Sequence, residues 1–416
     1  MTFTRRSVSE HQNVVTELMM GIPRPVERAT VREIAFGSRR TLAADLVAEF
    51  DMPTFDNSQM DGFAVRAADV RAATEKCPVE LRVTGHMAAG DHTGLIGIGE
   101  AWAVMTGASI PDGADAVIPI EESNFDSFPD RADTATLRVS APCPVGRFIR
   151  RRGSDIRGGE RIVSAGSPVT SALVGALASS GIEQLDVKRP LTALIVATGS
   201  ELRRPGAPDR PGSILDANTL MLTSLLTSVG VRVLTQESVP DDPDELLRVL
   251  DSRFGEMDLI VTAGGVSKGA HEVVRDCLEQ RGIEFGSVAM QPGGPQGVGT
   301  AHLASGDVPV VALPGNPVSA LVSAEVFLRP ALLAASGRWA FRSAHRGPLA
   351  EATSSPAGTL QVRRGRQRED GRITFEGGPS SHLLHAFARS TVLVFIPPER
   401  TSMDVGDIVE FWRIND

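Results

Sequence analysis

Apolar and polar positions along this chain follow two different patterns. Between residues 189 and 333, short apolar runs that end in glycine turns alternate with segments whose apolar residues recur at helical spacing. The run 191–199, for example, is followed by Leu222, Leu225 and Leu226, which would share one helix face. Strands that alternate with helices predict a doubly wound α/β domain with a parallel sheet and a core of its own.

Capping residues and helix breakers indicate where these elements begin and end. Pro243 and Pro317 fit the first turns of two helices, and each follows an expected polar cap. The expected cap before Pro317 is Asn316. Gly230 fits the end of a helix. We expect strands at 191–199, 231–239, 257–265 and 308–317, and helices at 217–230, 241–254, 270–282 and 316–328. Ligands of parallel α/β sheets bind at the carboxyl ends of the strands, which here are ATGSEL, TAGGVSKG and LPGNPVS.

The flanking segments are rich in short strands instead. Residues 47–147 contain apolar segments between Gly, Pro and Asp turns, which predicts a small β insertion domain. Residues 340–416 repeat this texture and predict a compact C-terminal β barrel. The stretch ALVGALASSGI (172–182) predicts a helix that leads the chain back to the α/β domain.

The composition is typical of a soluble globular protein, with 22% charged and 42% hydrophobic residues. A formal net charge of −9 argues against nucleic acid as the main partner. Three scattered cysteines without a CxxC pair argue against a zinc site and fit a reducing compartment. The sequence shows neither a signal-peptide pattern nor an apolar run of about 18 residues, so we expect a cytoplasmic protein that does not span a membrane.

Two of the predicted strand ends have the character of anion sites. GGVSKG (264–269) joins adjacent glycines, a hydroxyl and a lysine before a helix, and PGNPVS (314–319) precedes a second helix. Glycines expose backbone N–H groups, and a helix N-terminus adds partial positive charge. Either segment could also be an ordinary turn, and the first does not have Walker A spacing.

Three acidic residues lie close in sequence to these predicted strand ends and helix starts. Glu201 follows TGS, Asp216 precedes a predicted helix, and Glu272 follows GGVSKG. Asp216 and Glu272 could simply cap helices. Mg²⁺, however, is held by one or two carboxylates together with phosphate oxygens, so carboxylates beside anion sites favour a phosphorylated ligand.

Two further stretches place charge in turns. In DNSQMDGFAVR (56–66), Asp61 precedes Gly62 and an apolar strand, which fits either a polar turn or the rim of a site. FIRRRGSDI (148–156) fits either a solvated face or a phosphate-binding arginine cluster. No HExxH motif occurs and the eight histidines show no ligand spacing, so zinc-protease chemistry is not supported.

Taken in order, several motifs resemble the molybdopterin molybdenumtransferases (MoeA and the gephyrin E domain). The motifs are DNSQMDGFAVR, VMTGASIPDGADAVIPIEE, FIRRRGSDI, ATGSEL, ILDAN, TAGGVSKG and VALPGNPVSALV, and the match extends from about residue 12 to the C-terminus. The resemblance implies a multidomain α/β plus β fold with a central domain like the molybdopterin adenylyltransferases. The implied domains are 1–46 with 148–188 (helical and extended), 47–147 (β insertion), 189–335 (α/β, molybdopterin-binding) and 336–416 (β barrel).

The resemblance also implies a reaction and its partners. Molybdate would be inserted into adenylylated molybdopterin with release of AMP, in the presence of Mg²⁺, to form molybdenum cofactor. The implied assembly is a homodimer whose active cleft uses both subunits. A molybdopterin adenylyltransferase and apo-molybdoenzymes would be its partners. Charge neutralisation and positioning would supply most of the catalysis.

The resemblance assigns roles to individual residues. The catalytic set would be Asp61, Thr106, Asp155 and Glu201. Glu201, Asp216 and Glu272 would hold the metal. Substrate would be bound by Asp216, Asn218, Gly264, Gly265, Ser267, Lys268, Pro295, Ser319 and Arg364.

The chain departs from the family pattern in three places. Gln291 and Gly294 replace the two lysines of a loop that reads roughly KPGKP, and Ser200 replaces an Asp. These changes leave open a non-catalytic molybdopterin-binding or scaffold protein. A second alternative is adenylyltransferase-like activity confined to 189–333, although the complete flanking segments argue against it.

Overall fold

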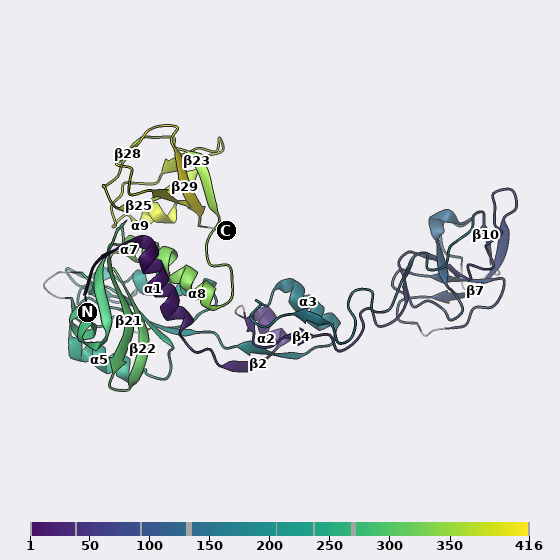
Figure 1. Ribbon diagram of the computed structural model, residues 1–416, viewed down its shortest axis with the longest axis horizontal. Helices are drawn as coiled ribbons and strands as arrows, with labels where there is room; N and C mark the ends of the chain where they lie inside the picture. The colour runs from purple at the N-terminus through teal and green to yellow at the C-terminus, as the bar shows by residue number, and fades with distance from the viewer. Residues whose placement is uncertain are drawn as a thin grey trace. The chain divides into compact units, whose positions relative to one another are not determined.

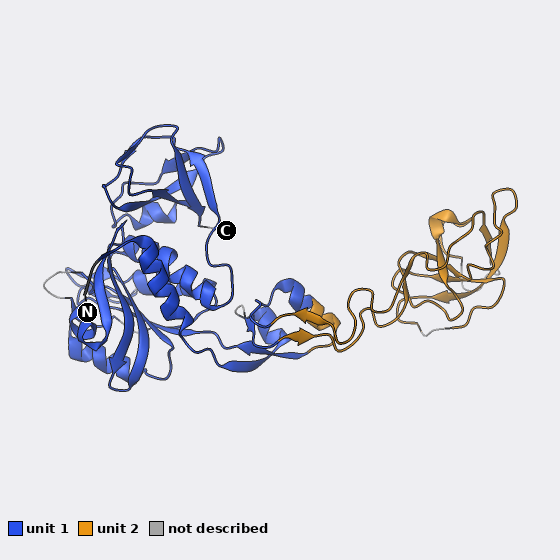
Figure 2. Cartoon of the chain, viewed as in Figure 1, with its two compact units in different colours: residues 1–44, 165–175, 183–416 blue, residues 45–164, 176–182 orange. Residues whose placement is uncertain are grey.

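The structure is a computed structural model that describes residues 2–37, 40–91, 94–129, 135–204, 206–235, 238–267 and 272–414. The chain forms two compact units (Figure 2). The first unit comprises residues 1–44, 165–175 and 183–416, and the second comprises 45–164 and 176–182. Each unit is described by itself below.

The central sheet of the first unit is mixed. Its strand order is β1-β19-β21-β22-β18-β14-β17. β14 pairs in parallel with β17 and β18, and β18 with β22, but β21 is antiparallel to both β19 and β22. The expectation of a wholly parallel sheet is therefore wrong at β21. Only Ala304 and Ser305 separate β21 from β22, and so short a connection forces a hairpin.

The strands of this sheet come from distant parts of the sequence (Figure 1). β1 is contributed by the N-terminus, and the other strands lie between residues 192 and 313. Their bounds are β1 Thr2–Arg6, β14 Thr192–Ala197, β17 Arg232–Thr235, β18 Leu259–Ala263, β19 Ile283–Val288, β21 Pro295–Leu303 and β22 Gly306–Leu313. The strand pair β15 (Leu202–Arg203) and β16 (Ile214–Leu215) follows β14 in the sequence.

The predicted helices of this region all form. They are α4 (Asn218–Ser228), α5 (Pro243–Ser252), α6 (Val273–Leu278) with the short η2 (Glu279–Arg281), and α7 (Pro317–Ser323). α7 continues through the π-helical η3 (Ala324–Leu328) into α8 (Arg329–Ala335). Asp242 caps α5 as its side chain accepts from the N–H groups of Asp244 and Glu245. Asn316 makes no side-chain capping bond, so the expectation of such a cap is wrong there.

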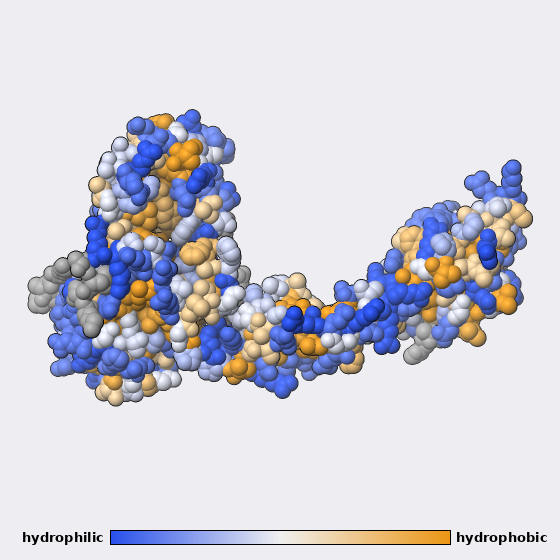
Figure 3. All heavy atoms as spheres, in the orientation of Figure 1, coloured by the Kyte–Doolittle hydropathy of each residue, from blue (hydrophilic) through white to orange (hydrophobic). Residues whose placement is uncertain are grey.

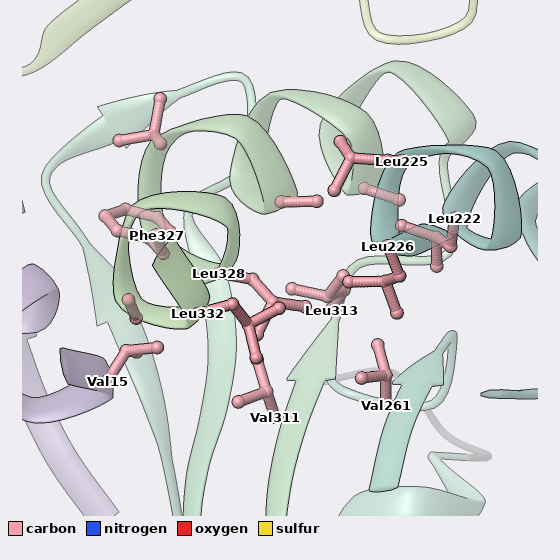
Figure 4. Close-up of a cluster of buried hydrophobic side chains, with 14 of the residues drawn as sticks. Val15, Leu222, Leu225, Leu226, Val261, Val311, Leu313, Phe327, Leu328 and Leu332 are labelled. Carbon is pink, nitrogen blue, oxygen red and sulfur yellow. The ribbon is translucent and has the colours of Figure 1, made fainter. Parts of the chain in front are cut away.

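The main hydrophobic core includes residues from outside the α/β segment (Figure 4). Val261 and Val311 of the sheet meet Leu222 of α4 and Phe327 of η3, and α1 (Val8–Met20) adds Val15. Val362, Phe387, Leu393 and Phe395 of the C-terminal segment belong to the same cluster. Residues 189–333 do form one core of their own, with members from Leu194 to Ala312, but they share this main core with α1 and the C-terminal segment.

The apolar composition of the helix Pro317–Ala335 is explained by its packing in this core. It is the one helix among the described residues that is long and apolar enough to cross a membrane by length and composition. Of its apolar 18-residue stretch, 72% is buried inside the protein. Phe327, Leu328 and Leu332 of this helix point into the cluster, so its apolar character serves packing (Figure 4).

The C-terminal segment forms a sheet in the order β20-β25-β27-β29-β23, with β26 paired to β25. This path of pairing begins at β20 and ends at β23, so a closed barrel stays a prediction. β20 lies before the α/β strand β21 in sequence and ties the two parts together. The bounds are β20 Met290–Gln291, β23 Ala344–Pro348, β24 Thr353–Ser354, β25 Leu360–Gln367, β26 Ile373–Phe375, α9 Leu384–Ala388, β27 Val392–Ile396, β28 Ser402–Met403 and β29 Ile408–Arg413.

The second unit contains the predicted β insertion. Its sheet has the order β10-β7-β8-β6-β9, and Phe63, Leu81 and Leu137 belong to a core drawn from this insertion alone. The bounds are β4 Leu46–Val47, β5 Asn57–Ser58, β6 Gly62–Val65, β7 Val79–Met87, β8 Glu100–Val104, β9 Ala116–Pro119, η1 Ile120–Glu122, β10 Ala135–Val139, β11 Ile149–Arg150 and β12 Arg161–Val163. The remaining helices and strands of the chain lie between residues 26 and 42 and between 171 and 188. They are β2 Val26–Thr30, α2 Val31–Phe36, β3 Thr41–Leu42, α3 Ser171–Ser179 and β13 Gln184–Lys188.

Candidate functional site

A cavity of about 730 Å³ lies at the carboxyl ends of β14, β18 and β22 in the first unit. The strand ends contribute Thr198, Gly199, Glu201, Ala263–Ser267 and Pro314–Pro317 to its lining. Residues 291–293, 295 and 379–381 supply further parts of the wall. The sequence predicts the site at this sheet edge, and a cavity forms there.

The turn after β18 requires glycine. Gly265 has φ +65°, in the left-handed region, and a Cβ added there would lie 2.9 Å from the backbone nitrogen of Val274. The Ser267 N–H donates to Glu272 Oε2 over 2.9 Å, which closes the loop. Lys268 lies outside the described residues.

Three carboxylate residues of the described chain line the cavity. Glu201 and Glu272 were predicted from sequence, and Asp241 was missed. Asp241 Oδ2 accepts from the Ser200 N–H over 3.1 Å, and the Asp241 N–H donates to Ser200 Oγ over 3.2 Å. Asp241 follows the strand β17, so its place beyond a parallel strand was a usable sequence signal.

Asp216 and Asn218 position helix α4 at the cavity edge. Asp216 is buried and accepts from the N–H and hydroxyl of Thr219, at 3.1 and 2.5 Å. It holds the first turn of α4 and is not among the residues that line the cavity. Asn218 does line it, and its side-chain amide donates to the Gly315 carbonyl over 2.7 Å. Asn218 thus joins α4 to the turn before α7.

The described lining carries negative side chains and no Lys or Arg. Donors for an anion are therefore hydroxyls, such as those of Ser267 and Ser319, and backbone N–H groups of the lining. Ser319 lies in α7, near the N-terminus of a helical run, where backbone N–H groups carry partial positive charge. Pro295, at the start of β21, also lines the cavity as predicted.

Arg364 lies behind the wall of the cavity. Its side chain is fully buried, and its Nη2 donates to the carbonyls of Gly378 and Ser380, directly beside the lining residues 379–381. Burial, and then the charge of Arg363, lowers the pKa of the Arg364 guanidinium. In the described part of the chain its Nε and Nη1 have no hydrogen-bond partner. Arg364 therefore supports the wall rather than lining it.

Asp61 and Thr106 form a pair within the second unit. Asp61 Oδ1 accepts from the Thr106 N–H over 2.7 Å and from the Thr106 hydroxyl over 2.9 Å. Both residues are exposed. A Cβ on Gly62 would lie 2.1 Å from the Ile118 carbonyl, so the glycine allows β6 to approach β9. This contact fixes the backbone that presents Asp61.

The arginine run of the second unit is largely paired. Arg151 donates to Asp56 over 2.6 Å, and Arg152 donates to Asp51 over 2.7 Å. The Gly158 N–H, and then Arg152, lower the pKa of Asp51. Asp155 is exposed, and its backbone N–H donates to the Met52 carbonyl over 3.0 Å. The run therefore forms an ion-paired face beside Asp155.

The predicted site residues thus fall into two groups. Those of the first unit meet at one cavity, with Asp216 and Arg364 behind it, while Asp61, Thr106 and Asp155 belong to the second unit. Within the described residues, no group of three or more His, Cys, Asp or Glu side chains is placed to hold a metal ion.

Three family models match successive segments of the chain. The MoeA N-terminal region (domain I and II) matches residues 6–181, a probable molybdopterin binding domain matches 194–334, and the MoeA C-terminal region (domain IV) matches 346–414. The chain is 39% identical to molybdopterin molybdenumtransferase 2 of Mycobacterium tuberculosis over 98% of its own length and 100% of the relative. The chain belongs to the molybdopterin molybdenumtransferase family.

Other members of this family are similar over similar lengths. The molybdopterin molybdenumtransferase of Synechococcus elongatus is 34% identical, with 94% of each chain covered. Among solved structures, a molybdopterin biosynthesis MoeA protein of Pyrococcus horikoshii superposes with a TM-score of 0.80 at 26% identity, and covers 99% of this chain and 100% of its own. The resemblance inferred from the sequence motifs is confirmed.

Proposed function

We propose that this protein inserts molybdate into adenylylated molybdopterin, with release of AMP, to form molybdenum cofactor. The observation that carries the proposal is the 730 Å³ cavity at the strand ends, in a chain that belongs to the molybdopterin molybdenumtransferase family. The cavity combines backbone donors and carboxylates, the groups that a phosphorylated ligand and a metal ion require together.

The roles of the residues follow from their positions. The hydroxyls of Ser267 and Ser319 and the backbone donors at the start of α7 would hold the phosphate groups of the substrate. Asn218 would keep α4 and the Gly315 turn in register. Asp61, fixed by Thr106, would bring a carboxylate to the reacting groups. The main contribution of these residues is to position the substrate and balance its charge.

Mg²⁺ fits the side chains that line this cavity. Glu201 and Glu272 are the predicted metal residues at the lining, and Mg²⁺ needs only one or two protein carboxylates when substrate phosphates supply the rest. The ion would neutralise phosphate charge there. Asp241 is a further candidate, and a metal role for Asp216 stays a prediction because its carboxylate already accepts two bonds from Thr219.

We further propose a cytoplasmic homodimer whose active cleft uses both subunits. Trp339 is 83% exposed and lines a cavity of mixed polarity with Ile34 and Val174 in the first unit. A large exposed apolar side chain beside a cavity supports a protein partner. Sedimentation at equilibrium tests the assembly, and a monomer at micromolar concentration would contradict it.

The reaction is tested with the purified full-length chain, adenylylated molybdopterin, Mg²⁺ and molybdate. We expect AMP release together with reconstitution of an apo-molybdoenzyme, and neither without molybdate or Mg²⁺. A non-catalytic scaffold would bind the adenylylated pterin without releasing AMP. A reaction that consumes ATP and molybdopterin instead would support the adenylyltransferase alternative.

A further inference from the structure

The second unit is marked by one strained backbone position rather than by the polarity of its surface. On the face that Figure 3 shows, hydrophilic and hydrophobic residues of this unit are mixed. Phe148, however, has φ +54°, while the other residues of the described chain with positive φ are glycines. A bulky aromatic residue in the left-handed region is strained, and strain of this kind is often found at functional sites.

The strain arises in a four-residue turn. The Ile149 N–H donates to the Gly146 carbonyl over 3.2 Å, so residues 146–149 form a turn whose third residue is Phe148. Where a turn needs positive φ at its third residue, glycine or asparagine is favoured there. The sequence instead places phenylalanine at this position, so other contacts must hold it.

Packing of the Phe148 ring offsets the strain. The side chain is half-buried and packs against a hydrophobic cluster of the second unit that includes Val104, Ala108 and Val117. On its other side, the Arg147 guanidinium lies over the ring, 4.9 Å from the centroid. The ring therefore holds a backbone conformation that the residue disfavours by itself.

This conformation directs two consecutive carbonyls to two different strands. The Arg147 carbonyl accepts from the Val117 N–H of β9, and the Phe148 carbonyl accepts from the Gln59 N–H, which follows β5, each over 2.9 Å. Because peptide bonds are planar, φ and ψ of Phe148 alone set the angle between these carbonyls. A residue that leaves the left-handed region here would misdirect one of them.

The segment that Phe148 holds, residues 58–61, carries Asp61. The Ser58 N–H donates to the Ala108 carbonyl, and the Gly107 N–H donates to the Ser58 carbonyl, each over 2.9 Å. These bonds fasten the segment to the turn whose threonine fixes Asp61 Oδ1. The Phe148 carbonyl adds a separate attachment, immediately before β11. Together the two attachments give Asp61 Oδ2 a fixed direction.

We infer that Phe148 is a positioning residue for Asp61, because its strained backbone fixes segment 58–61 and thereby the direction of the carboxylate. The catalytic importance of that direction rests on the proposed function, while the placement of the segment does not. A misplacement of about 1 Å can cost on the order of 100-fold in rate. Binding of the pterin substrate should be unaffected, because the main cavity belongs to the first unit.

Two substitutions at Phe148 separate the backbone from the side chain. Both Phe148→Asn and Phe148→Val remove the ring, but asparagine tolerates the left-handed region and a β-branched residue does not. We expect Phe148→Asn to keep kcat for AMP release within about threefold of wild type, and Phe148→Val to lower it by about tenfold or more with KM unchanged. Phe125→Val, which removes a half-buried phenylalanine elsewhere in this unit, is the control and should keep the wild-type kcat.

Hydrogen exchange at the Gln59 amide measures the placement of the segment without any reaction. Gln59 is exposed, so protection of its amide depends on the bond to the Phe148 carbonyl. We expect slow exchange in wild type and Phe148→Asn, and faster exchange in Phe148→Val.

The outcomes separate this inference from the proposed function. Equal kcat values in Phe148→Asn and Phe148→Val overturn it, as does a Gln59 amide that exchanges freely in wild type. Loss of activity that follows only the melting temperatures of the variants assigns Phe148 to folding alone and also overturns it. If wild type releases no AMP but exchange at Gln59 still separates the two variants, the proposed function fails while Phe148 keeps its role in placing segment 58–61.

Discussion

Single carboxylates in this protein differ in function because their partners differ. Asp216 and Asp56 each accept two hydrogen bonds from neighbouring groups of their own unit, and both stabilise local structure. Asp61 also accepts two bonds, but through one oxygen, so Oδ2 remains for another ligand. The same residue type after a turn therefore serves as a cap, as an ion-pair partner or as a candidate reactive group.

Asp61→Asn tests this assignment with the smallest change. The amide oxygen can still accept from the Thr106 N–H and hydroxyl, so we expect the unfolding transition to stay the same. Loss of the charge is expected to lower the rate of cofactor formation by roughly 100-fold, the lower range for a positioned acid or base. Asp112→Asn, at another exposed carboxylate of the second unit, is the control. Full activity in Asp61→Asn would contradict the assignment.

His11 predicts a pH dependence of stability. It is buried in α1 against Phe327, with ring centroids 4.7 Å apart, and burial, aided by Arg6, lowers its pKa to about 3. In the unfolded chain His11 binds a proton with a pKa near 6.5, whereas in the folded chain it stays neutral down to about pH 3. The free energy of unfolding therefore falls as pH drops from 6.5 toward 3. We expect a loss of roughly 2 kcal/mol between pH 6.5 and 5.

Urea unfolding at pH 7.5 and 5.0 measures this dependence. His11→Leu removes the titration, so the first unit of this variant should lose less stability on acidification than wild type does. His385→Gln, at an exposed histidine, is the control. Equal acid sensitivity in wild type and His11→Leu would sink the idea.

At the scale of elements, helix caps show how far a sequence pattern can be trusted. Asp242 and Asn316 both precede a proline at the start of a helix. Only Asp242 uses its side chain as a cap, while the Asn316 backbone leads directly into the cavity lining. The pattern located both helices correctly but did not determine the hydrogen bond.

Alanine substitutions distinguish the two caps. We expect Asp242→Ala to lower the free energy of unfolding by about 1 kcal/mol, because two N–H groups of α5 lose their acceptor. Asn316→Ala is expected to change it by less than about 0.5 kcal/mol, as is usual away from such features. Urea denaturation of both variants measures the difference. A larger effect at Asn316 would show that its side chain caps α7 in solution.

At the scale of the whole molecule, the two units differ in how their cores are built. The core of the insertion in the second unit comes from Phe63 to Cys143 in one continuous stretch. The main core of the first unit joins α1, the α/β segment and the C-terminal strands. The pairing of β1 with β19 and of β20 with β25 adds backbone hydrogen bonds to this dependence.

This difference predicts the behaviour of fragments. We expect residues 45–164 to fold alone with a cooperative thermal transition. Residues 189–335 alone would expose the surface that Val15, Met19 and Leu393 cover, and would leave the β19 edge unpaired. We expect this fragment to bind a hydrophobic dye and to aggregate. A monomeric fragment 189–335 with a sharp unfolding transition would refute the shared core.

The sequence by itself determined the elements, the family and most residues of the main cavity. Periodicity and turn residues are local properties, and the ends of parallel strands must lie at one edge, so Glu201, Gly264, Gly265, Ser267 and Ser319 could be placed there. Only the tertiary structure decided that β21 is antiparallel, that Asp241 lines the same cavity and that Arg364 lies behind its wall. These features depend on contacts between residues far apart in the sequence, which no local pattern encodes.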